Sequence, residues 1–76
     1  MNKDSMTGMV GTVTGTVRPG TLGEVMIAIR GGVEAFYALP FDGEEVIPAG
    51  ARCAVVDYRP QEASRTVYVT ALPDVP

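Results

Sequence analysis

Apolar residues recur at every second position in five segments of the chain. The sequence alternates in this way over residues 9–17, 22–30, 33–39, 51–58 and 65–72. Because successive side chains of a strand point to opposite faces, each segment is predicted to be a β-strand with one buried face. The predicted inward residues are Met9, Gly11, Val13, Gly15, Val17, Val25, Ile27, Ile29, Val33, Ala35, Tyr37, Leu39, Cys53, Val55, Val67, Val69 and Ala71.

Turn signals separate the predicted strands. Pro19-Gly20 favours a hairpin between the first two, and Gly31-Gly32 favours a tight turn before the third. The link over residues 40–50 is too short and too proline-flanked for a substantial helix, and we expect it to place Val46 or Ile47 over one barrel end. This order predicts an all-β, five-stranded Greek-key barrel of the OB-fold type without a substantial helix. An SH3-like barrel also has five strands and remains the alternative.

The chain of 76 residues corresponds to one domain. We expect a disordered lead-in over residues 1–7, the barrel over residues 8–72 and a tail over residues 73–76. No stretch approaches the roughly 20 apolar residues that a membrane-spanning helix needs. The first residues also lack the apolar centre of a signal peptide. We therefore expect a soluble, cytoplasmic domain that stands at the membrane face if it is part of a longer membrane protein.

Composition argues against most catalytic mechanisms. The chain has no histidine and one cysteine, so neither a histidine-based catalytic arrangement nor a structural zinc site is available. Cys53 falls on an inward position and is predicted to be a small core residue. The acidic cluster Asp42, Glu44 and Glu45 is interpreted as a solvated turn, because its spacing matches no calcium loop. We expect no enzymatic activity, no metal and no cofactor.

Several outward positions of the second, third and fifth strands are apolar. In an OB barrel the third strand lies between the other two, so some of these side chains are predicted to lie close together. Exposed apolar patches often mark interaction sites, and methionine and aromatic residues are enriched in them. The alternative is that they are scattered surface residues, or that the link over residues 40–50 covers them. The outward residues are Met26, Ala28, Phe36, Ala38 and Tyr68, with Met26, Phe36 and Tyr68 at the centre of the predicted surface.

Two arginines lie beside prolines in loops, Arg18 and Arg59. They are interpreted either as solubilising turn residues or as a basic rim that contacts an anionic partner. The alternative function is binding of single-stranded nucleic acid, for which an OB barrel uses aromatic and basic residues on the same face. A net charge of −3 and the flanking Glu24 and Glu34 disfavour this alternative. Its candidate residues are Phe36, Tyr37, Tyr68 and Arg30.

Short motifs along the chain resemble the C-terminal soluble domain of NfeD-like proteins. The opening motif is Gly11-Thr12-Val13, followed by Thr16-Val17-Arg18-Pro19-Gly20 and then by Gly23-Glu24-Val25. The likeness continues through Glu34-Ala35, the run Ile47-Pro48-Ala49-Gly50-Ala51-Arg52-Cys53-Ala54-Val55-Val56, and Val67-Tyr68-Val69. It therefore spans about residues 9–72.

The resemblance implies an OB barrel that family members usually carry behind transmembrane helices. Some members work with stomatin- or flotillin-type membrane proteins, and longer members add a serine-protease domain. No catalytic residue is carried over, because the barrel domain supplies none. The resemblance implies a non-enzymatic interaction barrel whose partner is a stomatin- or flotillin-type protein or a second copy. Contact with a membrane would come only through an anchor outside this sequence or through the partner.

Overall fold

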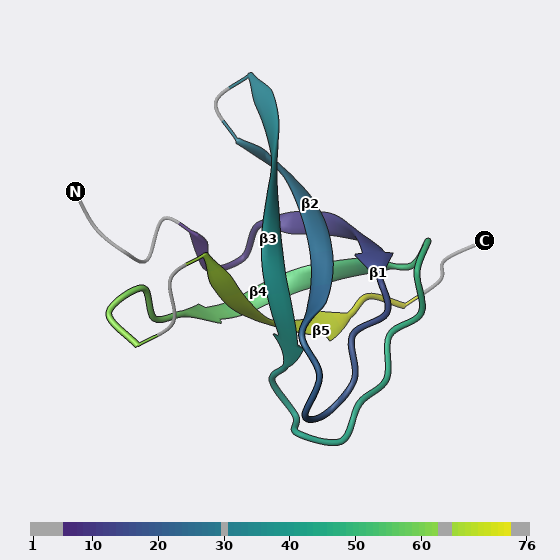
Figure 1. The fold of residues 1–76 in the computed structure, drawn as a ribbon. Helices are drawn as coiled ribbons and strands as arrows, with labels where there is room; N and C mark the ends of the chain where they lie inside the picture. The colour runs from purple at the N-terminus through teal and green to yellow at the C-terminus, as the bar shows by residue number, and fades with distance from the viewer. Residues whose placement is uncertain (1–5, 30, 63–64, 74–76) are drawn as a thin grey trace.

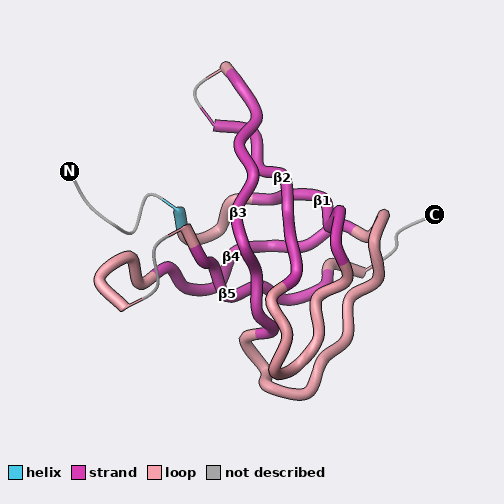
Figure 2. Tube along the Cα trace, in the orientation of Figure 1, coloured by secondary structure: helices cyan, strands magenta, loops and turns pink. Residues whose placement is uncertain are grey.

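Five β-strands make up the computed structural model, which describes residues 6–29, 31–62 and 65–73 (Figure 1). The strands are β1 (Val10–Gly15), β2 (Gly23–Ile29), β3 (Gly32–Pro40), β4 (Arg52–Tyr58) and β5 (Thr66–Ala71). All five predicted strands are confirmed, with ends displaced by one or two residues. Apart from a short helical turn at Met6, the described residues form strands, loops and turns (Figure 2), and none of their helices is long and apolar enough to cross a membrane.

The strands close into a barrel in the order β1-β2-β3-β5-β4, and β1 pairs with β4 to complete it. The β3–β5 pair is parallel and the other pairs are antiparallel. This order, with β3 between β2 and β5, is the one expected for the OB fold, so that prediction is confirmed over the SH3-like alternative. Closure removes most of the unpaired backbone edge that an open sheet of this size would present.

The core lies in the lumen of the barrel. Every strand contributes buried side chains, and the loop between β3 and β4 adds one more. Ile47 of that loop is fully buried beside Val17, with reciprocal backbone hydrogen bonds of 2.8 and 2.9 Å, whereas Val46 is exposed. The prediction that this loop covers one barrel end is therefore confirmed for Ile47. The most deeply buried strand residues are Val13, Val25, Ile27, Ala38, Cys53, Val55, Val67 and Val69.

The predicted orientation of β3 is wrong. Phe36 and Ala38, expected on the outside, are 5% and 0% exposed, whereas Val33 and Tyr37, expected inside, are 61% and 52% exposed. The two remaining odd positions, Ala35 and Leu39, are half-buried. The lumen side of β3 is therefore formed by Phe36, Ala38 and Pro40, whereas Glu34, nearer the hairpin turn, is exposed.

The cause of this inversion is the pairing between β2 and β3. The hairpin pairs Ile29 with Gly32, and each odd-numbered residue of β2 consequently faces an even-numbered residue of β3. Directly paired residues point to the same face of a sheet. Since Val25 points into the lumen, its partner Phe36 must do so as well.

Met6, in the predicted lead-in, packs against the barrel. Residues 1–5 of the predicted lead-in and residues 74–76 of the predicted tail lie outside the described residues. Met6, however, is only 7% exposed and belongs to the core cluster. The Gly8 N–H donates a 2.8 Å hydrogen bond to the Val55 carbonyl, which ties this segment to β4.

Two glycines allow backbone segments to approach each other closely. A Cβ atom on Gly23 would lie 2.6 Å from the Thr16 carbonyl oxygen and 2.7 Å from that of Gly15. A Cβ atom on Gly11 would lie 2.7 Å from the Met26 carbonyl oxygen. These contacts are with backbone atoms, which cannot move aside without disturbing the β1–β2 pairing.

Gly23→Ala should therefore destabilise the barrel by about 2–3 kcal/mol, as an overpacked core position does. The matched control is Gly32→Ala, because a Cβ atom there would meet nothing closer than 3.8 Å. Chemical denaturation of both variants measures the difference. Equal stability of the two variants would contradict the close approach at Gly23.

Cys53 is a buried free thiol in the lumen. Burial raises the pKa of this thiol above its usual value of 9.0, against a smaller lowering by a backbone hydrogen bond with Gly11. Because the folded state then holds the proton more tightly than the unfolded state, this contribution to stability is present below pH 9.0 and is lost as the pH rises further. The thiol should also be a poor nucleophile in the native protein.

We expect native Cys53 to react with a thiol reagent only as fast as the barrel opens, and at the free-thiol rate once unfolded. Part of the loss of unfolding free energy above pH 9.0 should disappear in Cys53→Val. Labelling kinetics and denaturation at pH values on either side of 9.0 measure the two effects. Rapid labelling of the native protein would show that the thiol is accessible.

Candidate functional site

A group of apolar side chains lies on the outer surface of β2, β3 and β5. Across β2 and β3, Met26 pairs with Ala35 and Ala28 pairs with Val33, while Leu39 of β3 pairs with Tyr68 of β5. Each of these side chains is exposed or half-buried. We refer to this surface as the outer face, defined by Met26, Ala28, Val33, Ala35, Tyr37, Leu39 and Tyr68.

The outer face retains three of the five apolar residues predicted to point outward, because Phe36 and Ala38 are buried. Met26 and Tyr68 are half-buried and Ala28 is exposed. Phe36 is a correction, because its side chain lies in the core and is only 5% exposed. Tyr37, its neighbour on β3, is the exposed aromatic residue instead.

The outer face is elongated along β3. Met26 is paired with Ala35, whereas Tyr68 is paired with Leu39. Leu39 lies four residue steps after Ala35 along β3, which corresponds to roughly 13 Å at about 3.3 Å per step. Met26 and Tyr68 are therefore not direct neighbours as predicted, and Tyr37 lies between them.

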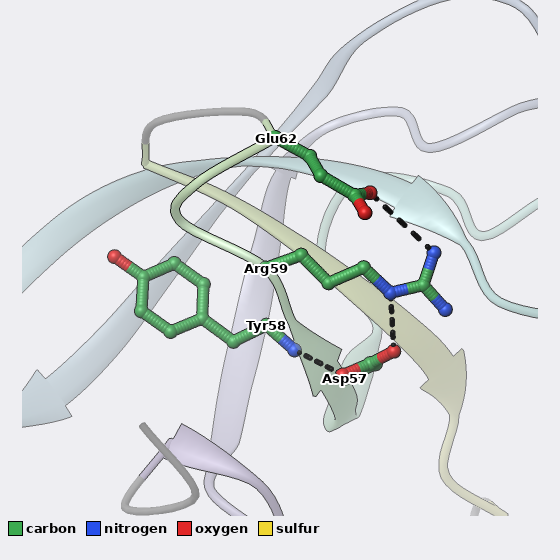
Figure 3. A network of polar contacts seen from close by, with 4 residues as sticks. All are labelled: Asp57, Tyr58, Arg59 and Glu62. Atoms are coloured by element: carbon green, nitrogen blue, oxygen red, sulfur yellow. Dashed lines mark hydrogen bonds and ion pairs between the residues drawn. The ribbon is translucent and has the colours of Figure 1, made fainter. Parts of the chain in front are cut away.

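Arg59 is held in a small polar network at the end of β4 (Figure 3). Its Nε donates a 2.7 Å hydrogen bond to Asp57, and Glu62 lies 3.8 Å from its Nη1. The hydrogen bond and the charge of Asp57 raise the pKa of the guanidinium. Its carbon Cζ also lies 5.0 Å from the centre of the Tyr68 ring. The structure therefore joins two predicted site residues, Arg59 and Tyr68, but carboxylates offset the arginine charge.

Arg18 lies far from this network. It is exposed in the β1–β2 loop, where it forms an isolated bridge with Thr21. In Figure 1 that loop lies below the barrel, whereas the loop after β4 extends to the left. Arg18 and Arg59 therefore do not form one basic rim, and of these two arginines it is Arg59 that borders the outer face.

Arg65 was not among the predicted site residues, but its guanidinium lies over the Phe36 ring. Its guanidinium lies 4.7 Å from the Phe36 ring centre, and Tyr58 meets the same ring edge-on at 6.2 Å. Its Nη2 donates a 2.7 Å hydrogen bond to the Ala35 carbonyl and lies 3.3 Å from Glu34. Arg65 adopts a left-handed backbone conformation with φ of 56°, which is uncommon for a residue with a side chain.

A shallow depression of about 170 Å³ opens on the outer face. Ala35 lies between the larger side chains of β3, and Tyr37 and Glu24 face each other across β2 and β3. Thr14 on β1 donates a 2.8 Å hydrogen bond from its hydroxyl to the Glu24 carboxylate. The residues that line the depression are Glu24, Ala35, Phe36, Tyr37 and Arg65.

The predicted acidic turn does not form a converging site. Glu45 turns toward β5, where its carboxylate accepts hydrogen bonds of 3.1 Å from the Thr70 hydroxyl and from the Ala71 N–H. Asp42 and Glu44 are exposed. Within residues 6–29, 31–62 and 65–73, no three carboxylate or thiol side chains are placed to hold a metal ion.

The alternative nucleic-acid surface gains little support from the geometry. Phe36 is buried, and Arg30 lies outside the described residues. The two arginines that border the outer face, Arg59 and Arg65, are each paired with a carboxylate. Such pairing leaves little net positive charge for a phosphate backbone, which is the main source of affinity in that class of complex.

Comparison with known proteins gives consistent results. A model of the NfeD C-terminal domain matches residues 10–70. The soluble domain of the NfeD protein YuaF from Bacillus subtilis is 29% identical, with a TM-score of 0.75 over 95% of this chain and 80% of that one. The C-terminal domain of stomatin operon partner protein 1510-C from Pyrococcus horikoshii is 31% identical, with a TM-score of 0.64 over 97% of this chain and 98% of that one. Among curated proteins no significant match was found.

The family match covers well over half of the sequence, so the chain belongs to the NfeD C-terminal domain family. The resemblance inferred from the glycine, Arg-Pro and valine motifs is thereby confirmed. The family and the two solved structures also agree with the barrel described above. The role of the outer face as a contact surface stays a prediction.

Two adjacent aromatic residues of β3 offer a direct check of the corrected orientation. Phe36→Ala removes a buried ring and should destabilise the protein by about 3–5 kcal/mol. Tyr37→Ala removes a ring that is 52% exposed and should cost about 1 kcal/mol or less. Denaturant unfolding of both variants provides the measurement. A larger loss for Tyr37→Ala would restore the orientation predicted from the sequence.

Proposed function

We propose that this barrel is a non-catalytic protein-interaction domain that binds its partner through the outer face. The observation that carries the proposal is the exposure of Val33 and Tyr37, at 61% and 52%, on one strand of a closed barrel. Outward positions of a barrel in water are normally polar. Apolar and aromatic side chains gathered along one strand are typical of the core of a protein interface.

The chemistry of the chain supports a binding role over a catalytic one. The sequence contains no histidine, and its single cysteine is buried with a raised pKa. Glu45 is occupied by hydrogen bonds to β5. Among the residues that the structure describes, these observations leave no evident nucleophile with an adjacent base, which most hydrolytic mechanisms require.

The favoured partner is a stomatin- or flotillin-type membrane protein. The support comes from family membership and from the similar archaeal domain, which is part of a stomatin operon partner protein. In this arrangement the barrel would stand at the membrane face, held there by its partner or by an anchor outside this sequence. Binding of a second copy through the same face is the competing outcome.

The test compares two pairs of exposed apolar residues. Val33→Ser with Tyr37→Ser alters the outer face, whereas Leu22→Ser with Val46→Ser alters residues of similar exposure in the loops. Binding to a purified stomatin-type protein of the same genome is measured by titration, and self-association by sedimentation velocity. The outer-face variant should bind at least about tenfold more weakly, as expected for central interface residues.

The loop variant is the matched control and should bind within about twofold of the unaltered protein. Circular dichroism of both variants confirms that the barrel remains folded. Equal binding by the two variants, or loss only in the loop variant, would refute the outer face as the contact surface. Absence of both binding and self-association in the unaltered protein would refute the proposed function itself.

A further inference from the structure

We propose that the depression over Ala35 accepts a lysine or arginine side chain from the partner, with the cation held between the Glu24 carboxylate and the Tyr37 ring. The proposal rests on the interaction function proposed above and names the chemistry that the outer face recognises. It follows from the shape of the depression, from the charge of its walls and from the exposure of its aromatic residue.

The shape of the depression arises from a small residue between larger ones. Ala35 shares its face of β3 with Val33 and Tyr37, because side chains two positions apart point the same way. The missing bulk at Ala35 leaves about 170 Å³ of open space on the surface. Arg65 borders this space on one side and Glu24 on another. The depression is therefore of a size for one side chain, not for a long nucleic-acid strand.

The Glu24 carboxylate supplies an uncompensated negative charge. The Thr14 hydroxyl, 2.8 Å from Oε1, holds the carboxylate in position and adds no charge. No ion pair involves Glu24 within the part of the chain that the structure describes. A cationic group that enters the depression would meet this carboxylate without displacing an existing charged partner.

The positive charge of the neighbouring Arg65 does not cancel the attraction of Glu24 for a cation. Its Nη2 lies 3.3 Å from the Glu34 carboxylate and 2.7 Å from the Ala35 carbonyl oxygen. Its guanidinium also lies over the Phe36 ring at 4.7 Å. Arg65 and Glu34 together are close to neutral, so Glu24 determines the sign of the charge that the depression attracts.

Tyr37 provides a second attraction for a cation. Its ring is about half exposed, and the electron-rich face of such a ring attracts an ammonium or guanidinium group. Its backbone N–H donates a 2.8 Å hydrogen bond to the Arg65 carbonyl, which holds this part of β3 against the start of β5. A carboxylate and an aromatic face on one depression discriminate a basic side chain from an apolar one of similar length.

Membrane-protein partners are expected to present lysine and arginine side chains. The chain has a net charge of −3, which favours a basic partner. Segments that flank membrane helices on the cytoplasmic side are rich in lysine and arginine. A membrane-protein partner would therefore present basic side chains close to where the barrel would stand.

The experiment uses a blocked pentapeptide with a central arginine flanked by glycines, titrated into the whole chain and followed by nuclear magnetic resonance of the backbone amides. The amide signals of Glu24, Ala35 and Tyr37 should move together and saturate. Two further peptides, with norleucine or glutamate in place of arginine, should produce no saturable shift at these positions. Added salt should weaken binding of the arginine peptide.

Variants then measure separately the contribution of the Glu24 charge and that of the Tyr37 ring. Glu24→Gln should weaken binding of the arginine peptide about threefold, and Tyr37→Ser by a similar factor. Glu44→Gln is the matched control, because it removes an exposed carboxylate from the β3–β4 loop and should leave binding unchanged.

Three outcomes would overturn the proposal: shifts located elsewhere, equal shifts with the norleucine peptide, or unchanged binding in Glu24→Gln. Partner binding distinguishes this failure from failure of the interaction function. If Val33→Ser with Tyr37→Ser abolishes partner binding while Glu24→Gln leaves it unchanged, the outer face is the interface but does not recognise a basic side chain. If neither change affects partner binding, the outer face itself is not the interface.

Discussion

The pairing of β2 with β3 is the constraint on which the other features of this barrel depend. Val25 points into the lumen, and because Phe36 is its partner, Phe36 and then Ala38 of β3 must face inward too. The same pairing places Val33, Ala35 and Tyr37 on the surface, next to Met26 and Glu24 of β2. A shift of one residue would exchange the buried and exposed sets of β3 completely. The core and the candidate contact surface are thus two results of a single register.

The alternation of apolar residues predicted the buried face of four strands correctly and that of β3 wrongly. In β1, β2, β4 and β5 the odd positions carry the valine and isoleucine residues that fill the lumen, so that parity was chosen correctly even though β2 also has Met26 and Ala28 at even positions. In β3 both parities are apolar, with Val33 and Tyr37 on one and Phe36 and Ala38 on the other, and alternation cannot decide between them. The deciding information was present in the turn: a two-residue hairpin forces an odd residue of β2 to face an even residue of β3.

The candidate site was harder to foresee than the fold, because its contacts join residues that are distant in sequence. Arg65 reaches Phe36 and Glu34 only after β5 has paired with β3. Its left-handed backbone conformation is typical of glycine or asparagine, so an arginine there gives no local signal. Arg59 was recognised as a loop arginine, but its position over Tyr68 depends on the β4–β5 pairing. The small side chain of Ala35 becomes informative only when its larger neighbours are known to share its face.

The hairpin of β2 and β3 extends beyond the rest of the barrel (Figure 1). β5 pairs with β3 only over Tyr37–Pro40, so among the described strands none covers the outer edge of β3 before that point. Exposed edges of this kind recruit strands from other molecules and begin fibril growth. Here the Arg65 guanidinium already occupies the Ala35 carbonyl on that edge. The arginine that covers Phe36 therefore also occupies a hydrogen-bonding group of this edge that a strand of another molecule would otherwise pair with.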